Sequence, residues 1–268
     1  MAVSDNSMDT LLDQAADVAD RMADSARSIC AKYFRQPFEV EHKADLSPVT
    51  VADREVESAL RALLRERFPN HAILGEEFGR SAGLAPGEAE YTWVIDPIDG
   101  TQSFVCGLPL FGCLIALLHG QQPVLGMIEM PALAERWRGR RGRPSTLNGK
   151  AARSSGCASL EQARVFTTSP EMFNAGDRER FQNMAARTAL RRYGGDCYSY
   201  GLLASGHCDL VVEAGLKPYD YLALVPVLEG AGACISDWNG NALGLESDGR
   251  VVAAASPALL REALEALA

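Results

Sequence analysis

An apolar strand that runs directly into two acids is encoded by residues 93–101, Trp-Val-Ile-Asp-Pro-Ile-Asp-Gly-Thr. Acids at the carboxyl end of a strand lie at the edge of the sheet, where open α/β sheets usually bind their ligands. The proline between the acids stiffens the turn, so we expect Asp96 and Asp99 to point at a common centre. Gly100 and Thr101 can then open a helix, whose free N–H groups and dipole favour an anion such as phosphate.

A second acidic pair, Glu76 and Glu77, lies about twenty residues upstream at another expected strand end, between Gly75 and Gly79. Carboxylates held close together repel one another unless a cation lies between them. Magnesium suits this setting, because it prefers hard oxygen ligands and shares the phosphate of a substrate. A surface turn is the alternative interpretation of Asp-x-x-Asp-Gly alone, since Asp and Gly are common turn residues. The second acidic pair favours the metal site.

Two other chemistries that use clustered acids fit the spacing poorly. A calcium loop requires Asp-x-Asp-x-Asp-Gly and a glutamate at the twelfth position, a pattern that this sequence lacks. A phosphatase with a covalent aspartyl intermediate would show Asp-x-Asp-Gly-Thr, whereas Asp96 and Asp99 are separated by three positions. The spacing disfavours both alternatives.

Two further acids can complete the site. Asp53 follows Thr50 by three positions, so it can form a capping box at the start of a helix. That structural role is compatible with a catalytic one. Asp220 lies just before an expected helix, where the alternative interpretation is a helix N-cap.

Taken together, these residues resemble the inositol monophosphatase family over nearly the whole chain. The resemblance is carried by Gly-Glu-Glu at 75–77, Asp-Pro-Ile-Asp-Gly-Thr at 96–101 and the late Asp220 that opens a helix. It implies an α/β protein with the layered α/β/α/β/α sandwich of the inositol monophosphatase and fructose-1,6-bisphosphatase type. It also implies a homodimer and a magnesium-dependent phosphomonoesterase.

The same resemblance assigns roles to individual residues. The implied ligands of two or three Mg²⁺ ions per site are Glu76, Asp96, the carbonyl oxygen of Ile98, Asp99 and Asp220. Metal-activated water attacks the phosphate directly, without a covalent enzyme intermediate, and Glu76 or the Asp53–Thr101 pair accepts its proton. Backbone N–H groups of Gly100 and Thr101 hold the phosphate, while Glu77 orients its neighbours.

Within the family the sequence is most similar to the histidinol-phosphate phosphatase branch, at residues 109–112, 194–200 and 211–221. The implied reaction converts L-histidinol phosphate to L-histidinol and phosphate, a step of histidine biosynthesis. Inositol 1-phosphate or another small phosphate monoester is the alternative substrate. Gln102 departs from the branch, in which a lysine often follows Asp-Gly-Thr.

Asp196 and Glu213 are the candidate substrate-binding residues. Histidinol phosphate carries an ammonium group and an imidazole, with which carboxylates can form charge-assisted hydrogen bonds. An inositol ring offers only hydroxyls, which give an acid at position 196 no obvious purpose. The alternative for Asp196 is a cap for the helix that follows.

The hydrophobic pattern divides the chain into an α+β half at residues 1–150 and an α/β half at 151–268. A polar, turn-rich stretch at 145–159 marks the junction, and 42–48 is expected to be a loop. The expected helices cover residues 9–33, 51–68, 177–189, 198–204, 220–231 and 257–267. The expected strands cover residues 72–74, 91–95, 111–118, 124–130, 164–168, 209–213, 234–236 and 251–254.

Charge and composition exclude several classes of function. The 268-residue chain has a net charge of −9, which argues against nucleic-acid binding, because such affinity comes mainly from neutralising phosphates. Five arginines crowd into residues 136–143, where a solvent-facing hairpin is favoured over a phosphate or nucleic-acid patch. The proposed metal ligands are all present, which disfavours a catalytically silent interaction protein.

The expected compartment is the cytoplasm. No apolar run approaches the roughly 20 residues of a membrane span, and the acidic N-terminal stretch does not have the pattern of a secretory signal. None of the seven cysteines forms a Cys-x-x-Cys pair, and scattered free thiols suit a reducing environment. No membrane partner is expected.

Overall fold

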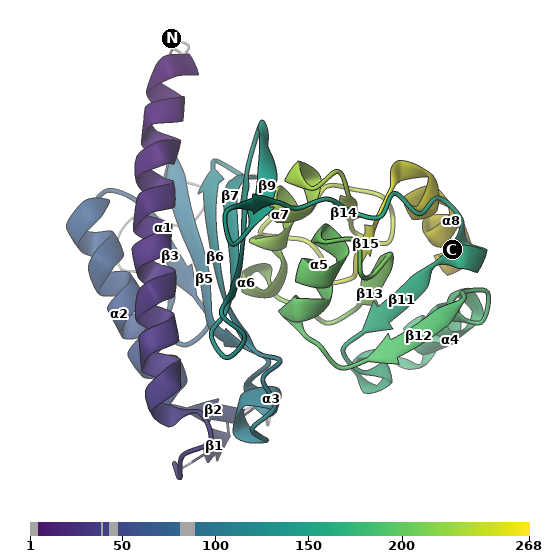
Figure 1. The fold of residues 1–268 in the computed structure, drawn as a ribbon, viewed down its shortest axis with the longest axis horizontal. Helices are drawn as coiled ribbons and strands as arrows, with labels where there is room; N and C mark the ends of the chain where they lie inside the picture. Colours follow the sequence, from purple (N-terminus) through teal and green to yellow (C-terminus); the bar gives the residue numbers. More distant parts are fainter. Residues whose placement is uncertain (1–4, 39, 43–47, 81–88) are drawn as a thin grey trace.

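The computed structural model describes residues 5–38, 40–42, 48–80 and 89–268 (Figure 1). Two β-sheets alternate with three layers of helices, and the two halves of the chain lie side by side. Among the described helices, none is long and apolar enough to cross a membrane.

Two helices form the first layer, α1 (Asp5–Tyr33) and α2 (Val51–Arg67). They pack against each other and against one face of the first sheet (Figure 1). The buried positions Ala15, Met22 and Ala26 follow the spacing of three and four that predicts one apolar helical face. Both expected helices are therefore confirmed.

An eight-stranded sheet forms the second layer, in the order β10-β9-β8-β7-β6-β5-β3-β4. Strand β5 is parallel to β3 and antiparallel to β6. The strands are β3 (Ala72–Gly75), β4 (Gly79–Arg80), β5 (Tyr91–Asp99), β6 (Gly112–His119), β7 (Gln122–Met130), β8 (Glu135–Arg140), β9 (Arg143–Leu147) and β10 (Lys150–Ala151). The short helix α3 (Thr101–Val105) follows β5 directly.

A small hairpin joins α1 to α2 and consists of β1 (Val40–His42) and β2 (Pro48–Thr50). The expected loop at 42–48 begins and ends in these strands, and its residues 43–47 lie outside the described part of the chain. The hairpin lies at the same end of α1 as α3 (Figure 1).

The third layer lies between the two sheets and contains α5 (Cys197–Ala204), α6 (Pro218–Tyr221) and α7 (Leu224–Gly230). One helix was expected at 220–231, whereas two short ones form. Pro226 has no N–H group, so it suits the first turn of a helix, where the N–H groups have no helical partner. Pro226 is the third residue of α7 and therefore lies in this first turn.

A five-stranded sheet and two outer helices complete the sandwich. The sheet order is β12-β11-β13-β15-β14, with β11 (Arg164–Thr167), β12 (Leu190–Tyr193), β13 (Leu210–Glu213), β14 (Cys234–Ser236) and β15 (Val251–Ala254). Its outer face is covered by α4 (Ala175–Ala185) and α8 (Pro257–Leu267). Single 3₁₀ turns lie at Leu160–Gln162 and Pro170–Met172. The five layers confirm the expected α/β/α/β/α sandwich.

Five of the described strands were not predicted, namely β1, β2, β4, β10 and β12. All four residues of β12 are exposed, so the strand has no buried face to produce an alternating pattern. The helix expected at 177–189 begins at Ala175, where Asn174 caps it, and ends at Ala185.

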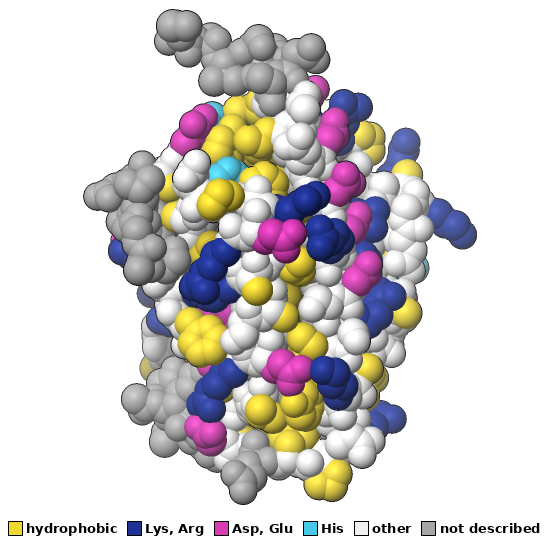
Figure 2. Space-filling view, turned by 90° about the vertical axis from the view of Figure 1, so that its left-hand side faces the viewer, with side chains coloured by type: hydrophobic (Ala, Val, Ile, Leu, Met, Phe, Trp, Pro, Cys, Tyr) yellow, Lys and Arg dark blue, Asp and Glu magenta, His cyan; other side chains and the backbone are white. Residues whose placement is uncertain are grey.

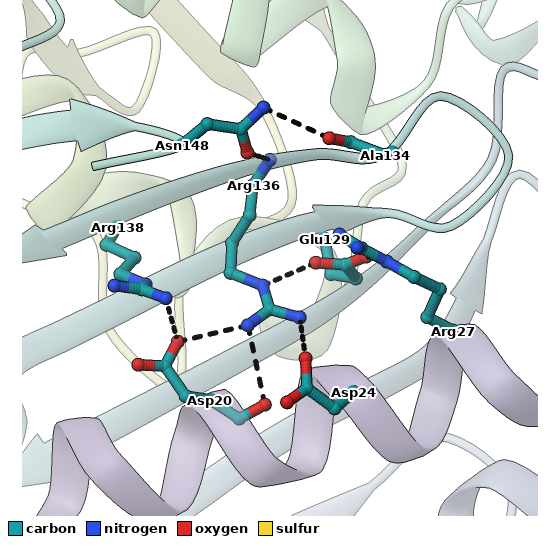
Figure 3. A network of polar contacts seen from close by, with 8 residues as sticks. All are labelled: Asp20, Asp24, Arg27, Glu129, Ala134, Arg136, Arg138 and Asn148. Atoms are coloured by element: carbon teal, nitrogen blue, oxygen red, sulfur yellow. Dashed lines mark hydrogen bonds and ion pairs between the residues drawn. The ribbon is translucent and has the colours of Figure 1, made fainter. Parts of the chain in front are cut away.

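The arginine-rich segment 136–143 forms the hairpin of β8 and β9, as predicted, and it faces solvent in part, since Arg138, Arg141 and Arg143 are exposed. Arg136 is buried, and its guanidinium donates to Asp24 Oδ1 and to Glu129 Oε2, each at 2.6 Å (Figure 3). Arg138 pairs with Asp20 at 2.5 Å. Alternate residues of a strand share one face, and here α1 covers that face with acids.

The same pairing continues along α1 toward its N-terminus. Arg140 forms ion pairs with Asp9, at 2.6 Å, and with Asp13. On the side of the molecule formed by α1 and α2, acidic and basic side chains are interspersed (Figure 2). The arginines of β8 therefore bind the protein's own acids, and the expected absence of a nucleic-acid partner stays a prediction.

Candidate functional site

A hollow lies at the carboxyl end of β5, between the two sheets. Among its described lining residues, six are acidic and none is lysine, arginine or histidine. The acidic residues come from the β3–β4 turn, β5, the start of α5, β13 and α6, and they are Glu76, Asp96, Asp99, Asp196, Glu213 and Asp220. Elements far apart in the sequence therefore converge on one acidic site.

An irregularity in β5 brings its two acids to the same side. Asp96 pairs with Leu114 and Asp99 with Gly112, so between these two pairs β5 contains one more residue than β6. Side chains three positions apart would point to opposite faces of a regular strand, and an extra residue cancels that alternation. Asp96 also accepts the backbone N–H of Ile98 at 3.0 Å, which fixes the turn.

Asp220 completes a cluster of three carboxylates. One oxygen each of Asp96, Asp99 and Asp220 can be chosen so that all three lie within 4.8 Å of one another. The backbone N–H of Lys217 donates to Asp220 Oδ2 at 2.7 Å. Asp220 is the third residue of α6, so the alternative that made it the N-cap is wrong. The backbone N–H of Cys197 orients Asp99 at 2.6 Å.

The electrostatics of the cluster favour a cation. Burial raises the pKa of Asp96 well above its usual value, and the nearby charges of Glu76, Asp99 and Asp220 raise it further. Burial also raises the pKa of Asp220, to about 7. Close carboxylates shift in this direction when no positive charge compensates them. Their oxygens are the hard donors that Mg²⁺ prefers, so the donor set fits this metal.

Asp53 serves two contacts at once. Its Oδ2 accepts the backbone N–H of Thr50 at 2.8 Å, which confirms the predicted capping box of α2. The hydroxyl of Thr101 lies 3.4 Å from Asp53 Oδ1 and 3.0 Å from the carbonyl oxygen of Ile98. The structure thus brings the expected Asp53–Thr101 pair together at the rim of the site.

Gly100 occupies a position that only glycine fits well. Its φ angle of 83° is in the left-handed region, and an added Cβ would lie 2.9 Å from Asp196 Oδ2 and 3.0 Å from the carbonyl oxygen of Leu110. Gly100 precedes α3 and lines the hollow together with Thr101. The sequence expectation that Gly100 and Thr101 open a helix is confirmed.

Asp196 and Glu213 both line the hollow, close enough for the charge of one to affect the pKa of the other. Asp196 has a φ angle of 45° and accepts a hydrogen bond from Ser103 Oγ at 3.2 Å. It occupies the N-cap position of α5, as the alternative predicted, but within the described part of the chain its side chain accepts no bond from the helix N–H groups. Burial, with the charge of Glu213, raises the pKa of Asp196 to about 6.

Glu213 is held firmly by its neighbours. Its Oε1 accepts the backbone N–H and the hydroxyl of Thr168 at 2.9 and 2.5 Å, and its Oε2 accepts the Tyr200 hydroxyl at 2.7 Å. A carboxylate has about four acceptor positions. These contacts leave Glu213 less capacity for a ligand than Asp196 has.

One residue near the site escaped the sequence reasoning. Glu57 is fully buried and accepts the backbone N–H groups of Glu77 and Phe78 at 2.7 and 3.1 Å. These donors belong to the turn that carries Glu76. Only its spacing could have indicated this role, since Glu57 follows Asp53 by four residues and therefore lies on the same face of the helix.

Comparison with known proteins agrees with this architecture. The model of the "Inositol monophosphatase family" matches residues 11–268. A "Bifunctional phosphatase IMPL2, chloroplastic" of Arabidopsis thaliana is 45% identical over 266 residues, 97% of this chain and 76% of the relative. A "Histidinol-phosphatase" of Chlorobaculum parvum is 34% identical over 238 residues, 88% of this chain and 90% of the relative.

A solved structure shows the same fold. An inositol monophosphatase from Zymomonas mobilis has a TM-score of 0.86 and 43% sequence identity, and the match covers 95% of this chain and 98% of that one. The family model and these relatives place the chain among the phosphatases. The chain belongs to the inositol monophosphatase family.

Proposed function

We propose that this phosphatase hydrolyses L-histidinol phosphate to L-histidinol and phosphate in a magnesium-dependent reaction. The observation that carries the proposal is the acidic hollow, which continues beyond the three clustered carboxylates to Asp196 and Glu213. The first group suits a metal and a phosphate, and the second suits a cationic substrate. Inositol 1-phosphate stays the alternative.

The residues that would hold Mg²⁺ are Glu76, Asp96, the carbonyl oxygen of Ile98, Asp99 and Asp220, for two or three ions. All of them line the hollow. Bound magnesium would polarise the phosphate and lower the pKa of a coordinated water. The ion count and the individual ligand roles stay proposals.

The protein's own groups would act on the proton and on the phosphate. Thr101 places its hydroxyl within reach of Asp53, so this pair, or Glu76, can accept the proton of the attacking water. The N–H groups of Gly100 and Thr101 would hold phosphate oxygens. The tight turn at Gly100 lets the backbone approach the phosphate, because no Cβ intervenes.

Substrate choice would depend mainly on Asp196. Its side chain is half-buried, contacts Ser103 and keeps free acceptor positions, whereas Glu213 is occupied by Thr168 and Tyr200. An ammonium or imidazolium group would offset the repulsion between the two acids. Similarity to the histidinol-phosphatase of Chlorobaculum parvum supports this substrate, and similarity to the inositol monophosphatase of Zymomonas mobilis supports the inositol alternative.

A comparison of two substrates tests the proposal. Phosphate release from L-histidinol phosphate and from inositol 1-phosphate is measured with the wild-type chain and with Asp196→Asn. Asn keeps the shape but removes the charge, so we expect KM for histidinol phosphate to rise about tenfold to a hundredfold, or about 1.4–2.8 kcal/mol. Turnover of inositol phosphate should change little. An unchanged KM for histidinol phosphate would remove the support for Asp196 as the selector.

The assembly and the compartment are also proposals. We propose a homodimer, as the family resemblance implies, and light scattering on the purified chain would show whether its mass is twice 28.8 kDa. A cytoplasmic location is proposed from the sequence. Fractionation of the source cells would test it.

A further inference from the structure

Three charged side chains occupy one buried face of α2. Asp53, Glu57 and Arg61 follow one another at intervals of four residues, which places them in a row along the helix. All three are buried. The first reaches Thr101, and the other two reach the turn between β3 and β4. One rigid helix therefore contacts two parts of the proposed active site.

Glu57 binds the turn that carries Glu76. The turn spans residues 76–78, because Gly75 pairs with Gly79 where β3 meets β4. Two consecutive N–H groups of this turn, those of Glu77 and Phe78, donate to the Glu57 carboxylate. Such donors would otherwise be left without a partner in a partly buried turn, so the carboxylate determines the path of the backbone.

Arg61 fixes the Glu57 carboxylate and the far end of the turn. Its Nε donates to Glu57 Oε1 at 2.7 Å, and its Nη2 donates to the carbonyl oxygen of Gly79. Both side chains of this ion pair are almost completely removed from solvent. A buried pair with further hydrogen bonds holds its geometry closely, because removing one partner leaves the other charge uncompensated.

Gly75 shows how closely the turn and the carboxylate fit. A Cβ at this position would lie 2.1 Å from Glu57 Oε1, so any larger residue would displace the carboxylate. The backbone N–H of Glu76 is tied separately to the carbonyl oxygen of Ile95 on β5, at 3.2 Å. The backbone around Glu76 is therefore held by β5 on one side and by α2 on the other. Glu76 itself lines the hollow.

We propose that the Glu57–Arg61 pair is a positioning device that holds Glu76 in the magnesium site and fixes its distance from Asp53. The inference rests on the proposed magnesium-dependent function. Neither residue lines the hollow, so both act through the turn. They set metal affinity rather than contact the substrate.

Direct magnesium binding tests this role. Calorimetric titration of the metal-free chain with Mg²⁺ is performed for the wild type and for Glu57→Gln. The amide can accept only one of the two N–H groups well, because its own NH₂ group faces the other donor. We expect the Kd for Mg²⁺ to rise at least tenfold. With saturating Mg²⁺, KM for the phosphate substrate should stay within about twofold of the wild type.

A matched control separates positioning from general loss of stability. Glu129 is also fully buried and also paired with arginine, but its side chain points toward α1 (Figure 3). Glu129→Gln should lower the thermal midpoint at least as much as Glu57→Gln does, while the Kd for Mg²⁺ stays within twofold. A rise in Kd of equal size in both variants would overturn the positioning role.

A milder variant covers the case in which Glu57→Gln does not fold. Arg61→Lys keeps the positive charge beside Glu57 but lacks the second donor that reaches the carbonyl oxygen of Gly79. We therefore expect a Kd for Mg²⁺ about threefold higher. If the wild type binds Mg²⁺ and the folded variants bind it with an unchanged Kd, the positioning role is overturned but the proposed function is not. A wild-type chain that does not bind Mg²⁺ overturns the proposed function instead.

Discussion

Two groups of acids lie on opposite faces of the eight-stranded sheet, and they differ in what neutralises them. On the α1 side, Asp20, Asp24 and Glu129 are paired with the guanidinium groups of Arg27, Arg136 and Arg138 (Figure 3). On the other side, the hollow at the end of β5 collects six acids and, among the described lining residues, no basic one.

The difference separates an acid that stabilises the fold from an acid that is kept for a ligand. A buried charge is costly unless it is paired, and Arg27 and Arg136 meet this need for the buried Glu129. The hollow does not meet it with its own residues, and the pKa values of Asp96, Asp99 and Asp220 are raised, first by burial and then by one another or by neighbouring acids. Strongly shifted carboxylates in a cleft mark a functional site.

Neutralising an acid should have opposite effects in the two regions. Asp96→Asn should lower phosphatase activity at least about a thousandfold, or about 4 kcal/mol of transition-state stabilisation. The metal-free variant should be as stable as the wild type or more stable, because the amide removes a repelling charge. Steady-state kinetics and thermal unfolding measure the two effects. Normal turnover of this variant would contradict the metal site.

On the paired side, the loss should appear in stability and not in activity. Glu129→Gln leaves Arg27 and Arg136 without their shared buried carboxylate, so we expect the free energy of unfolding to fall by about 3 kcal/mol. For a chain of this size, that corresponds to a thermal midpoint roughly 6–10 °C lower. The value of kcat at saturating magnesium should be unchanged. A fall in kcat with unaltered stability would reverse the distinction between the two regions.

The pH dependence of stability sharpens the comparison. The pKa of Asp220 is about 7 in the folded chain and 3.8 in its ordinary state, so the folded chain binds this proton more tightly. Stability of the metal-free chain should therefore fall as pH rises through this window, by about 2 kcal/mol between pH 5 and 8.

Magnesium should oppose this trend. Metal binding requires deprotonated carboxylates, so the rise in thermal midpoint that Mg²⁺ produces should be larger at pH 8 than at pH 6. Thermal scans with Mg²⁺ and with a chelator, at both pH values, give the comparison. A magnesium effect that is larger at pH 6 would contradict the link between the metal and these acids.

The smallest effect is expected at the exposed end of the arginine network. Asp9 and Asp13 are largely exposed, so their pairs with Arg140 are screened by water. Replacing both acids with asparagine should cost about 1 kcal/mol or less at low salt. Denaturant unfolding at low and high salt measures this, with the smaller loss expected at high salt.

The strand-end acids were predictable because their signal is local. Asp96, Asp99, Gly100 and Thr101 follow an apolar strand within nine residues, and the order of these residue types alone indicates a site at the sheet edge. The family resemblance supplied the layered fold. The division near residue 150 and the individual metal roles stay predictions.

The partners of buried charges were not predictable, because they come from remote parts of the chain. The alternation of Arg136, Arg138 and Arg140 correctly indicated one face of a strand. Nothing in that stretch shows that α1 covers the face, since Asp24 lies 112 residues away from Arg136. The contact of Glu57 with the turn after Glu76 spans twenty residues or more and is equally hidden.

The central claim is that the acids of the hollow form the site of a magnesium-dependent phosphatase. The most direct test follows phosphate release from L-histidinol phosphate while Mg²⁺ is added back to the metal-free chain. We expect no release without the metal and a saturable increase as it is added. Undiminished release without magnesium, or none at saturating magnesium from either histidinol phosphate or inositol 1-phosphate, would contradict the claim.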